Sequence, residues 1–427
     1  MAILVGGGPA PGINAVIAAA TIRARLEGVE VIGIEEGFSR IMEGDVSLAR
    51  PLTIENTSRI HFRGGSYVGI SRANPTTSPE LLENTVRAFE HLGVDKLVTI
   101  GGDDTAFSAM QLEAKAAGRL RVVHVPKTID NDLDLPPHVD TFGFQTARHV
   151  GVEIIKNLMV DARTTSHWYF VIAMGRKAGH LALGIGKAAG ATLTLIPEEF
   201  SRRPIRLHTI VDTLVGAIIK RLADGRRDGV VVIAEGVGMA VDPADVHALG
   251  EAERDAHGNI RLSEINFDDI IKRAVQERLK QLGIRAPSIA AKNIGYELRC
   301  ADPIPFDMEY SRDLGYCAAK ALIDGGNAVM ISMQAGQFVP IPFATLIDAG
   351  TGRTKVRMVD IRSARYAIAR RYMIRLRRDD FSDDRELLRC AEAAGMTPAE
   401  FRRQFEPLTA DEPPALDLMP GATPSRR

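Results

Sequence analysis

Several short segments of the chain combine glycines, carboxylates and basic residues in the way that phosphate chemistry requires. The first is Gly6 to Asn14 (GGGPAPGIN), between a predicted strand and a predicted helix. Consecutive glycines let a backbone approach a ligand closely, and a helix N-terminus offers free N–H groups to an anion. The segment fits neither a Walker A loop nor a dinucleotide-binding fingerprint. It indicates a phosphate loop, although a tight strand-to-helix turn would also explain it.

A second segment, Gly101 to Thr105 (GGDDT), comes directly after an apolar run. Ligands of parallel sheets bind at the carboxyl ends of the strands, and Asp103 in that place can hold a hydrated Mg²⁺. The alternative is that Asp103 or Asp104 only caps a helix.

The next strand ends in Pro126 to Asp132 (PKTIDND). Two carboxylates two residues apart, with Lys127 at hand, suit the deprotonation of a hydroxyl beside a charged phosphate. One acid would be the base and the other would lie near the metal. An Asx-turn loop is the alternative, but three phosphate-compatible loops at three strand ends argue against coincidence.

Two further segments bring basic side chains. Met174 to His180 (MGRKAGH) follows a strand, and Arg176 offers a forked, permanently charged contact to a phosphate or a sugar. Tyr296 and Arg299 lie three residues apart and can both reach one phosphate if the chain turns there. Each segment alone would also fit an ordinary surface position.

The elements that must position these residues follow a regular pattern. Short Val- and Ile-rich runs alternate with segments of helical period, which predicts an α/β fold of two doubly wound lobes with parallel sheets. The predicted strands are Ala2–Val5, Val29–Ile34, Lys96–Ile100, Val122–Val125, Tyr169–Met174, Thr192–Ile196, Val230–Ala234 and Val329–Met333. The predicted helices include Gly12–Leu26, Pro79–His91, Phe144–Val160, His208–Leu222, Phe267–Leu282 and Tyr310–Ile323.

Composition excludes several classes of protein. The 427 residues carry 53 Lys and Arg against 54 Asp and Glu, a net charge of −1, which argues against nucleic-acid binding. Three cysteines provide neither a disulfide framework nor a zinc site and fit a reducing compartment. No apolar run is long enough for a membrane helix and no signal-peptide layout is visible, so we expect a cytoplasmic protein without a membrane partner.

Together the segments resemble the phosphofructokinase family over roughly Ile3 to Met333. Gly6 to Asn14 is similar to the family's first phosphate loop, Gly64 to Ser66 with Ser71 and Arg72 to its next loop, and Gly101 to Thr105 to its metal-binding loop. Pro126 to Asp132 resembles the signature around its catalytic base. The resemblance implies two Rossmann-like lobes with the active site in the cleft between them.

The resemblance also implies a role for each matched residue. Asp130 would take the proton from the 1-hydroxyl of fructose 6-phosphate, Asp103 would hold Mg²⁺, and Arg72 would stabilise charge on the transferring group. Gly7 would offer its backbone N–H to the phosphoryl donor. The sugar phosphate would contact Thr128, Ile129, Asp130, Met174, Gly175, Arg176, Glu235, Tyr296 and Arg299.

Two residues depart from the ATP-dependent branch of the family, which has glycine at both places. A carboxylate at Asp104 would fill the space of a nucleotide α-phosphate and repel its charge. Lys127 would add a point charge for a free terminal phosphate. Both resemble the pyrophosphate-dependent branch, which implies a reversible transfer in glycolysis and gluconeogenesis. An ATP-dependent enzyme is the alternative.

Two other readings fit less well. Lipid and NAD kinases have a similar glycine-aspartate loop but are not expected to share Pro126 to Asp132 together with Met174 to Arg176. A non-catalytic phosphosugar-binding subunit is expected to lose Asp103 or Asp130, and both are present. Whether the implied homo-oligomer is a dimer or a tetramer stays open, as does sedoheptulose 7-phosphate as an acceptor.

The resemblance implies a donor and magnesium lobe of residues 1–141 plus about 300–360 and a sugar-phosphate lobe of residues 142–299. A C-terminal helical segment, 361–410, and a disordered tail, 411–427, are expected to follow. The polar stretch Met239 to Asn266 is expected to be a surface hairpin or loop. The basic residues around Arg370 and from Arg375 to Arg378 are expected to form a solvated helix face. An anionic effector site or a subunit contact is the alternative.

Overall fold

The computed structural model describes residues 1–247, 267–348, 350 and 354–417. Its contacts divide the chain into two units. Unit 1 consists of Met1–Gly151 and Gly295–Arg357, and unit 2 of Val152–Ile294 and the chain from Met358 onward. Most of the polar stretch from Met239 to Asn266 lies outside the described residues, as do residues 418–427 of the expected tail.

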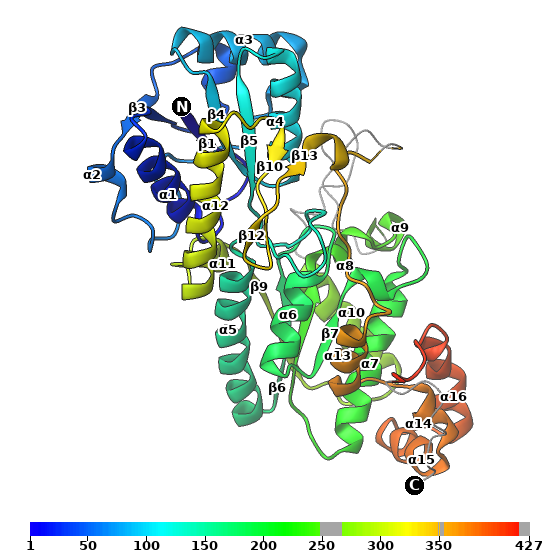
Figure 1. Ribbon diagram of the computed structural model, residues 1–427. Helices are drawn as coiled ribbons and strands as arrows, with labels where there is room; N and C mark the ends of the chain where they lie inside the picture. Colours follow the sequence, from blue (N-terminus) through cyan, green and yellow to red (C-terminus); the bar gives the residue numbers. More distant parts are fainter. Residues whose placement is uncertain (248–266, 349, 351–353, 418–427) are drawn as a thin grey trace. The chain divides into compact units, whose positions relative to one another are not determined.

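Unit 1 is built on a seven-stranded sheet with the strand order β13-β10-β5-β4-β1-β2-β3 (Figure 1). The strands from β10 to β2 run parallel, whereas β13 and β3 pair antiparallel at the two edges. The strands are β1 (Ala2–Val5), β2 (Val31–Ile34), β3 (Ala49–Leu52), β4 (Lys96–Gly101), β5 (Arg121–Pro126), β10 (Val329–Met330) and β13 (Ile341–Pro342). β3 was not predicted, because Arg50 and Pro51 interrupt its apolar pattern.

A separate two-stranded hairpin follows β10. It pairs β11 (Met333–Gln334) with β12 (Gln337–Phe338). The predicted strand Val329–Met333 is therefore divided between β10 and β11.

The helices of unit 1 cover both faces of its sheet. Side chains alternate along β1, so that Ile3 and Val5 pack with helices α1 and α12 while Leu4 packs with α3 and α4. The helices are α1 (Ile13–Leu26), α2 (Ile54–Thr57), α3 (Pro79–His91), α4 (Asp103–Ala116), α11 (Tyr296–Arg299) and α12 (Pro305–Ile323). This arrangement confirms the predicted α/β class for unit 1.

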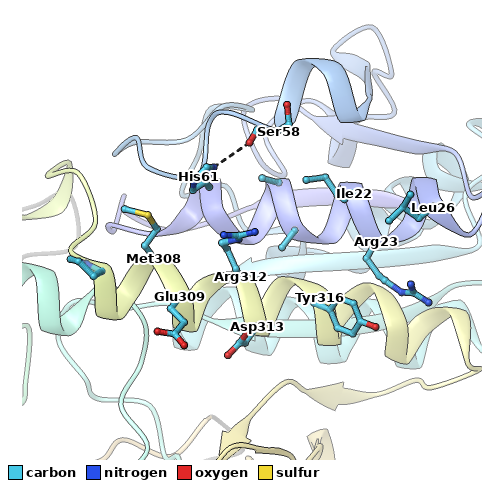
Figure 2. Close-up of a pocket in the computed structure, with 13 residues that line it drawn as sticks. Ile22, Arg23, Leu26, Ser58, His61, Met308, Glu309, Arg312, Asp313 and Tyr316 are labelled. Carbon is cyan, nitrogen blue, oxygen red and sulfur yellow. Dashed lines mark hydrogen bonds between the residues drawn. The ribbon is translucent and has the colours of Figure 1, made fainter.

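An open pocket of about 520 Å³ lies along α1 and α12 (Figure 2). The Arg23 guanidinium lies 5.2 Å from the centre of the Tyr316 ring, and His61 Nδ1 lies 3.2 Å from the Ser58 carbonyl. The pocket lining contains none of the predicted site residues.

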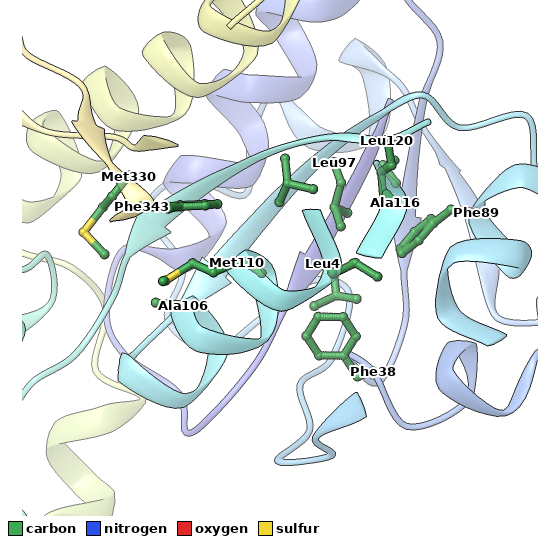
Figure 3. Close-up of a cluster of buried hydrophobic side chains, with 14 of the residues drawn as sticks. Leu4, Phe38, Phe89, Leu97, Ala106, Met110, Ala116, Leu120, Met330 and Phe343 are labelled. Carbon is green, nitrogen blue, oxygen red and sulfur yellow. The ribbon is translucent and has the colours of Figure 1, made fainter. Parts of the chain in front are cut away.

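The core beneath α3 and α4 is formed by residues from distant parts of the chain (Figure 3). Leu4, Leu97 and Phe89 are completely buried there. Met330 and Phe343 join the cluster from the chain that follows α12. Burying a side chain of this size contributes about 1.5–3 kcal/mol, so the core holds the strand ends, and the loops that follow them, in fixed positions.

Unit 2 is built on a four-stranded parallel sheet with the order β7-β8-β6-β9. Its strands are β6 (His167–Ala173), β7 (Leu193–Leu195), β8 (Gly229–Ala234) and β9 (Ser288–Ile294). β9 was not predicted, because its sequence SIAAKNI carries Lys292 and Asn293 in place of a continuous apolar run.

The helices of unit 2 include a C-terminal group. They are α5 (Phe144–Thr165, which begins in unit 1), α6 (His180–Ala189), α7 (Leu207–Ala223), α8 (Glu235–Met239), α9 (Pro243–His247), α10 (Phe267–Gln281), α13 (Ala364–Tyr372), α14 (Arg378–Ser382), α15 (Asp384–Ala393) and α16 (Pro398–Phe405). Short 3₁₀ helices span Ile41–Glu43, Pro75–Thr77, Pro197–Glu199, Phe343–Thr345 and Glu406–Thr409. No helix among the described residues is sufficiently long and apolar to span a bilayer.

The expected solvated face of the C-terminal arginines is wrong for two of them. Arg370 and Arg375 are only 8% and 7% exposed. Arg375 Nη1 lies 2.8 Å from the Glu199 carboxylate, which the Tyr366 hydroxyl also contacts at 2.8 Å. A buried carboxylate thus compensates the buried charges and attaches the C-terminal helices to unit 2.

The expected disorder is also wrong for the first residues of the tail. Asp411 accepts a hydrogen bond from the Ser201 hydroxyl, and Glu412 accepts one from the Arg378 N–H at 2.7 Å. These two bonds hold the first residues of the predicted tail against unit 2.

The boundaries of the units differ from those drawn from the sequence. Residues 142–151 belong to unit 1, because the buried Asp307 accepts hydrogen bonds from the N–H groups of Gly143 and Thr146 at 2.9 and 2.6 Å. Residues 295–299 also belong to unit 1, and residues 358–360 to unit 2.

Candidate active site

Three of the predicted loops meet at one edge of the unit 1 sheet. They follow β1, β4 and β5, which are neighbours in that sheet and run parallel. The Gly6 N–H donates to the Ile100 carbonyl at 2.9 Å, and the Lys127 N–H donates to the Gly101 carbonyl at 2.7 Å. The glycine loop, the metal loop and the loop of the predicted base therefore form one continuous surface.

Glycine is required at position 101 because the Thr105 side chain lies very close to its backbone. A Cβ atom there would lie 2.2 Å from the Thr105 Cβ, closer than any side chain permits. Thr105 belongs to the first turn of α4, so glycine allows that turn to lie directly against the end of β4.

The backbone N–H of Gly7, the expected contact to the phosphoryl donor, connects two loops. It donates to the Ser71 carbonyl at 2.8 Å, so in this structure the group already has a partner. Glycine is needed at this position for its φ of +86°, which few other residues adopt. The bond aligns the first phosphate loop with the Ser71 and Arg72 segment, where the Arg72 side chain is exposed.

Asp103 and Asp104 are the first two residues of α4. The N-cap is Gly102, so the alternative in which an aspartate caps this helix is wrong. Carboxylates in the first turn are stabilised by the positive end of the helix dipole. Asp104 is exposed, and Asp103 is half-buried.

The start of α4 fits a magnesium ion of the kind that accompanies phosphates. Mg²⁺ is commonly held by one or two carboxylates together with water and substrate phosphate oxygens, without a complete protein cage. The described residues include no group of three or more His, Cys, Asp or Glu that could hold a metal ion. Asp103, beside a phosphate loop, fits a magnesium ion whose other ligands are water and phosphate oxygens.

Lys127 is buried at the centre of this surface, with an exposed fraction of 3%. Its Nζ donates to the Gly8 carbonyl and lies 3.4 Å from the position of a Cβ on Gly7. The Arg299 guanidinium carbon lies 3.3 Å from the position of a Cβ on Gly8. Two cationic side chains thus flank the glycine loop, and Arg299 was expected in the other lobe.

Asp130 lies in the loop after β5 and is 4% exposed. Its N–H donates to the Thr128 Oγ1 at 3.0 Å, and the Thr128 carbonyl accepts from the Thr141 hydroxyl at 2.7 Å. Ile129 is buried at 3% exposure. The loop is therefore ordered by its own side chains before any ligand binds.

His124 lies beneath these loops, and no motif in the sequence indicates it. It is completely buried in β5, with Nε2 3.0 Å from the Gly101 carbonyl and Nδ1 2.9 Å from the Thr99 Oγ1. Burial lowers its pKa to about 3, and the charge of Lys127 acts in the same direction. A neutral imidazole therefore supports the carbonyl at the start of the metal loop.

The buried His124 is expected to make the fold sensitive to acid. Its pKa is about 3 when folded and 6.5 in its ordinary state, so the unfolded chain binds a proton that the folded chain does not. The free energy of unfolding should fall as the pH decreases through this interval, by up to about 1.4 kcal/mol per pH unit. Urea titrations at pH 7 and pH 5 should show a smaller difference for His124→Gln than for the exposed control His91→Gln, and equal differences would contradict the prediction.

The loop Met174 to Arg176 and Glu235 lie together in unit 2. They follow β6 and β8, which are parallel neighbours. The Glu235 Oε2 accepts hydrogen bonds from the N–H groups of Gly175 and Arg176, both at 3.1 Å. The Met174 N–H donates to the Ile294 carbonyl at 3.0 Å. Glu235 therefore orders the loop that carries Arg176.

Tyr296 and Arg299 both lie on the short helix α11, so the chain turns between them. Tyr296 is 81% exposed, and the Arg299 guanidinium lies 5.9 Å from the centre of its ring. Both residues belong to unit 1, and the other predicted sugar-phosphate residues from position 174 onward belong to unit 2.

Comparisons with known proteins identify the family of the chain. The family model for phosphofructokinase matches residues 1–322. A relative from Thermotoga maritima named pyrophosphate–fructose 6-phosphate 1-phosphotransferase is 50% identical over 410 residues, covering 95% of this chain and 97% of the relative. A relative from Naegleria fowleri with the same name is 46% identical, covering 95% of each chain.

A solved structure supports the fold. Phosphofructokinase from Saccharomyces cerevisiae superimposes with a TM-score of 0.64 at 21% sequence identity. The match covers 81% of this chain and 44% of the yeast chain, so the chain spans less than half of that larger protein.

Proposed function

Because the chain belongs to the phosphofructokinase family, we propose that it transfers a phosphoryl group from inorganic pyrophosphate to the 1-hydroxyl of fructose 6-phosphate. The products are fructose 1,6-bisphosphate and phosphate, and the reaction runs in both directions. The 50% and 46% identical relatives carry names that state this pair of substrates.

The position of Lys127 is the observation that favours pyrophosphate over ATP as the phosphoryl donor. Its ammonium group contacts the Gly8 carbonyl and lies beside Gly7, within the glycine loop. A buried cation here attracts the terminal charge of a small inorganic anion. Asp104 is the second residue of α4. By the family resemblance, its negative charge would lie where a nucleotide places a further phosphate.

The magnesium-binding role is proposed for Asp103. When bound, Mg²⁺ supplies positive charge that neutralises phosphate oxygens during transfer. The protein contributes Lys127 on one side of the glycine loop and Arg299 on the other. Arg72, exposed beside the same loop, is proposed to stabilise charge on the transferring group.

The proposed base is Asp130. Buried in a loop that its own hydrogen bonds order, it can align the 1-hydroxyl of the sugar and accept its proton. Thr128 and Ile129, next to Asp130 in the chain, would contact the sugar beside its 1-hydroxyl. Phosphoryl transfer depends on positioning and charge stabilisation more than on covalent chemistry, so a rigid loop suits the reaction.

The sugar phosphate is proposed to contact Arg176, Tyr296 and Arg299. Arg176 would provide a forked contact from a loop that Glu235 orders through the Gly175 N–H. Tyr296 and Arg299, both on α11, would also contact it. The family resemblance further favours a homodimer or homotetramer in the cytoplasm.

Steady-state assays with Mg²⁺ and fructose 6-phosphate test this function directly. We expect rapid formation of fructose 1,6-bisphosphate with pyrophosphate and little with ATP. In reverse, fructose 1,6-bisphosphate and phosphate should yield pyrophosphate. Activity with ATP alone would refute the choice of donor, and inactivity with both donors in both directions would refute the transferase function.

A further inference from the structure

The backbone directly after the proposed base has an uncommon conformation. Asn131 has a φ of 56°, in the left-handed region that asparagine tolerates better than most residues. Its Oδ1 accepts from the Thr141 N–H at 3.0 Å, and its Nδ2 donates to the Asp140 Oδ1 at 2.7 Å. Asn131 directly follows Asp130, so these bonds fix the course of the backbone next to the proposed base.

Arg357 reaches this loop from a segment 226 residues further along the chain. Its Nε and Nη2 donate to the Asn131 carbonyl at 3.2 and 3.1 Å, and Nη2 also donates to the Asn131 Oδ1. Its Nη1 donates to the Val139 carbonyl at 2.8 Å, on the other arm of the loop. The Arg357 backbone N–H donates to the Asp132 carbonyl at 2.8 Å. One residue therefore connects both arms.

The guanidinium is suited to this task by its shape. Its donors form a rigid planar fork, whereas a lysine ammonium is a compact point charge on a flexible stem. Burial lowers the pKa of Arg357, and the carboxylates of Asp140, Asp134 and Asp132 raise it. Arg357 is the last residue of unit 1. Its bonds therefore also connect the second segment of that unit, Gly295–Arg357, to the first, Met1–Gly151.

We propose that Arg357 is a positioning residue for phosphoryl transfer, which acts by holding Asn131 and thereby aiming the Asp130 carboxylate. The proposal rests on the proposed function, in which Asp130 is the base. In this proposal Arg357 contacts neither substrate. Its loss should therefore slow the chemical step and leave substrate binding nearly unchanged.

The variant Arg357→Lys tests the proposal in the full-length protein. Displacing a catalytic group by about 1 Å can cost about 10²-fold in rate, so we expect kcat with pyrophosphate to fall by about 10- to 100-fold while both KM values change by less than about threefold. The matched control is Arg119→Lys, because the Arg119 guanidinium also donates to backbone carbonyls of unit 1, at Ala116 and Lys115, but at the far end of α4. That control should retain the wild-type kcat.

A double-mutant cycle with Asn131→Gly distinguishes positioning from general stabilisation. Glycine accepts a positive φ but also leaves it without restraint, so Asn131→Gly alone should lower kcat. If Arg357 acts through Asn131, the double variant should be no slower than the slower single variant. Independent effects would instead multiply.

The outcomes separate the proposal from the function on which it rests. An inactive wild type with either donor refutes the function. With an active wild type, an unchanged kcat for Arg357→Lys, raised KM values with normal kcat, or multiplying effects in the cycle would overturn the role of Arg357. If Arg357→Lys does not fold, an unchanged kcat for Asn131→Gly would overturn it equally.

Discussion

Replacing Asp130 with asparagine is expected to lower kcat for transfer from pyrophosphate by about 10²- to 10⁴-fold, the range of a lost general base. Asparagine has nearly the same shape and keeps hydrogen-bonding groups in a position that is 4% exposed. It cannot accept the proton of the sugar hydroxyl. Because the loop geometry is retained, both KM values should change by less than about threefold.

The control for this experiment is Asp95→Asn. Asp95 precedes β4 at the opposite end of the strand and pairs with Lys96 at 2.6 Å, away from the loops. Steady-state rates in both directions should be normal for this variant. A kcat above about one tenth of the wild-type value for Asp130→Asn would exclude Asp130 as the base.

The second large effect is expected at Lys127. The variant Lys127→Met should lower kcat/KM for pyrophosphate by about 10²- to 10³-fold, comparable to the loss of one preorganised charge-stabilising group. Methionine fills the buried site without the charge, so the loss would report the ammonium beside the Gly7 and Gly8 loop. Lys115→Met, an exposed residue in the last turn of α4, is the matched control.

The donor preference itself is tested by Asp104→Gly combined with Lys127→Gly. This pair removes the negative charge at the start of α4 and the cation beside the glycine loop, and gives both positions the glycine of the ATP-dependent branch. We expect weak pyrophosphate activity and a higher kcat/KM for ATP than in the wild type. A double variant that keeps its pyrophosphate preference would show that other residues select the donor.

The tertiary structure contains bonds that no spacing in the sequence reveals. Gly7 matched a phosphate loop, yet its N–H is used by the Ser71 carbonyl, which lies in a different loop. The basic run around Arg370 and Arg375 indicated a solvated face, yet Glu199 draws both residues into unit 2. A run of charged residues in the sequence does not show whether folding places an oppositely charged residue from a distant part of the chain beside it.

By itself the sequence determined the α/β class and the grouping of the three loops. Apolar runs of strand length mark buried parallel strands, and the residues that follow such strands must share one edge of the sheet. This physical constraint brought Gly101, Lys127 and the glycine loop together as expected.

Only the tertiary structure decided how that edge is supported. His124 contacts the Gly101 carbonyl from within β5, and Arg357 contacts Asn131 across 226 residues. Hydrogen bonds of this kind depend on where the folded chain passes in space, and they leave no periodicity in the sequence. The residue types therefore predicted the chemistry, while long-range packing set the positions from which these side chains perform it.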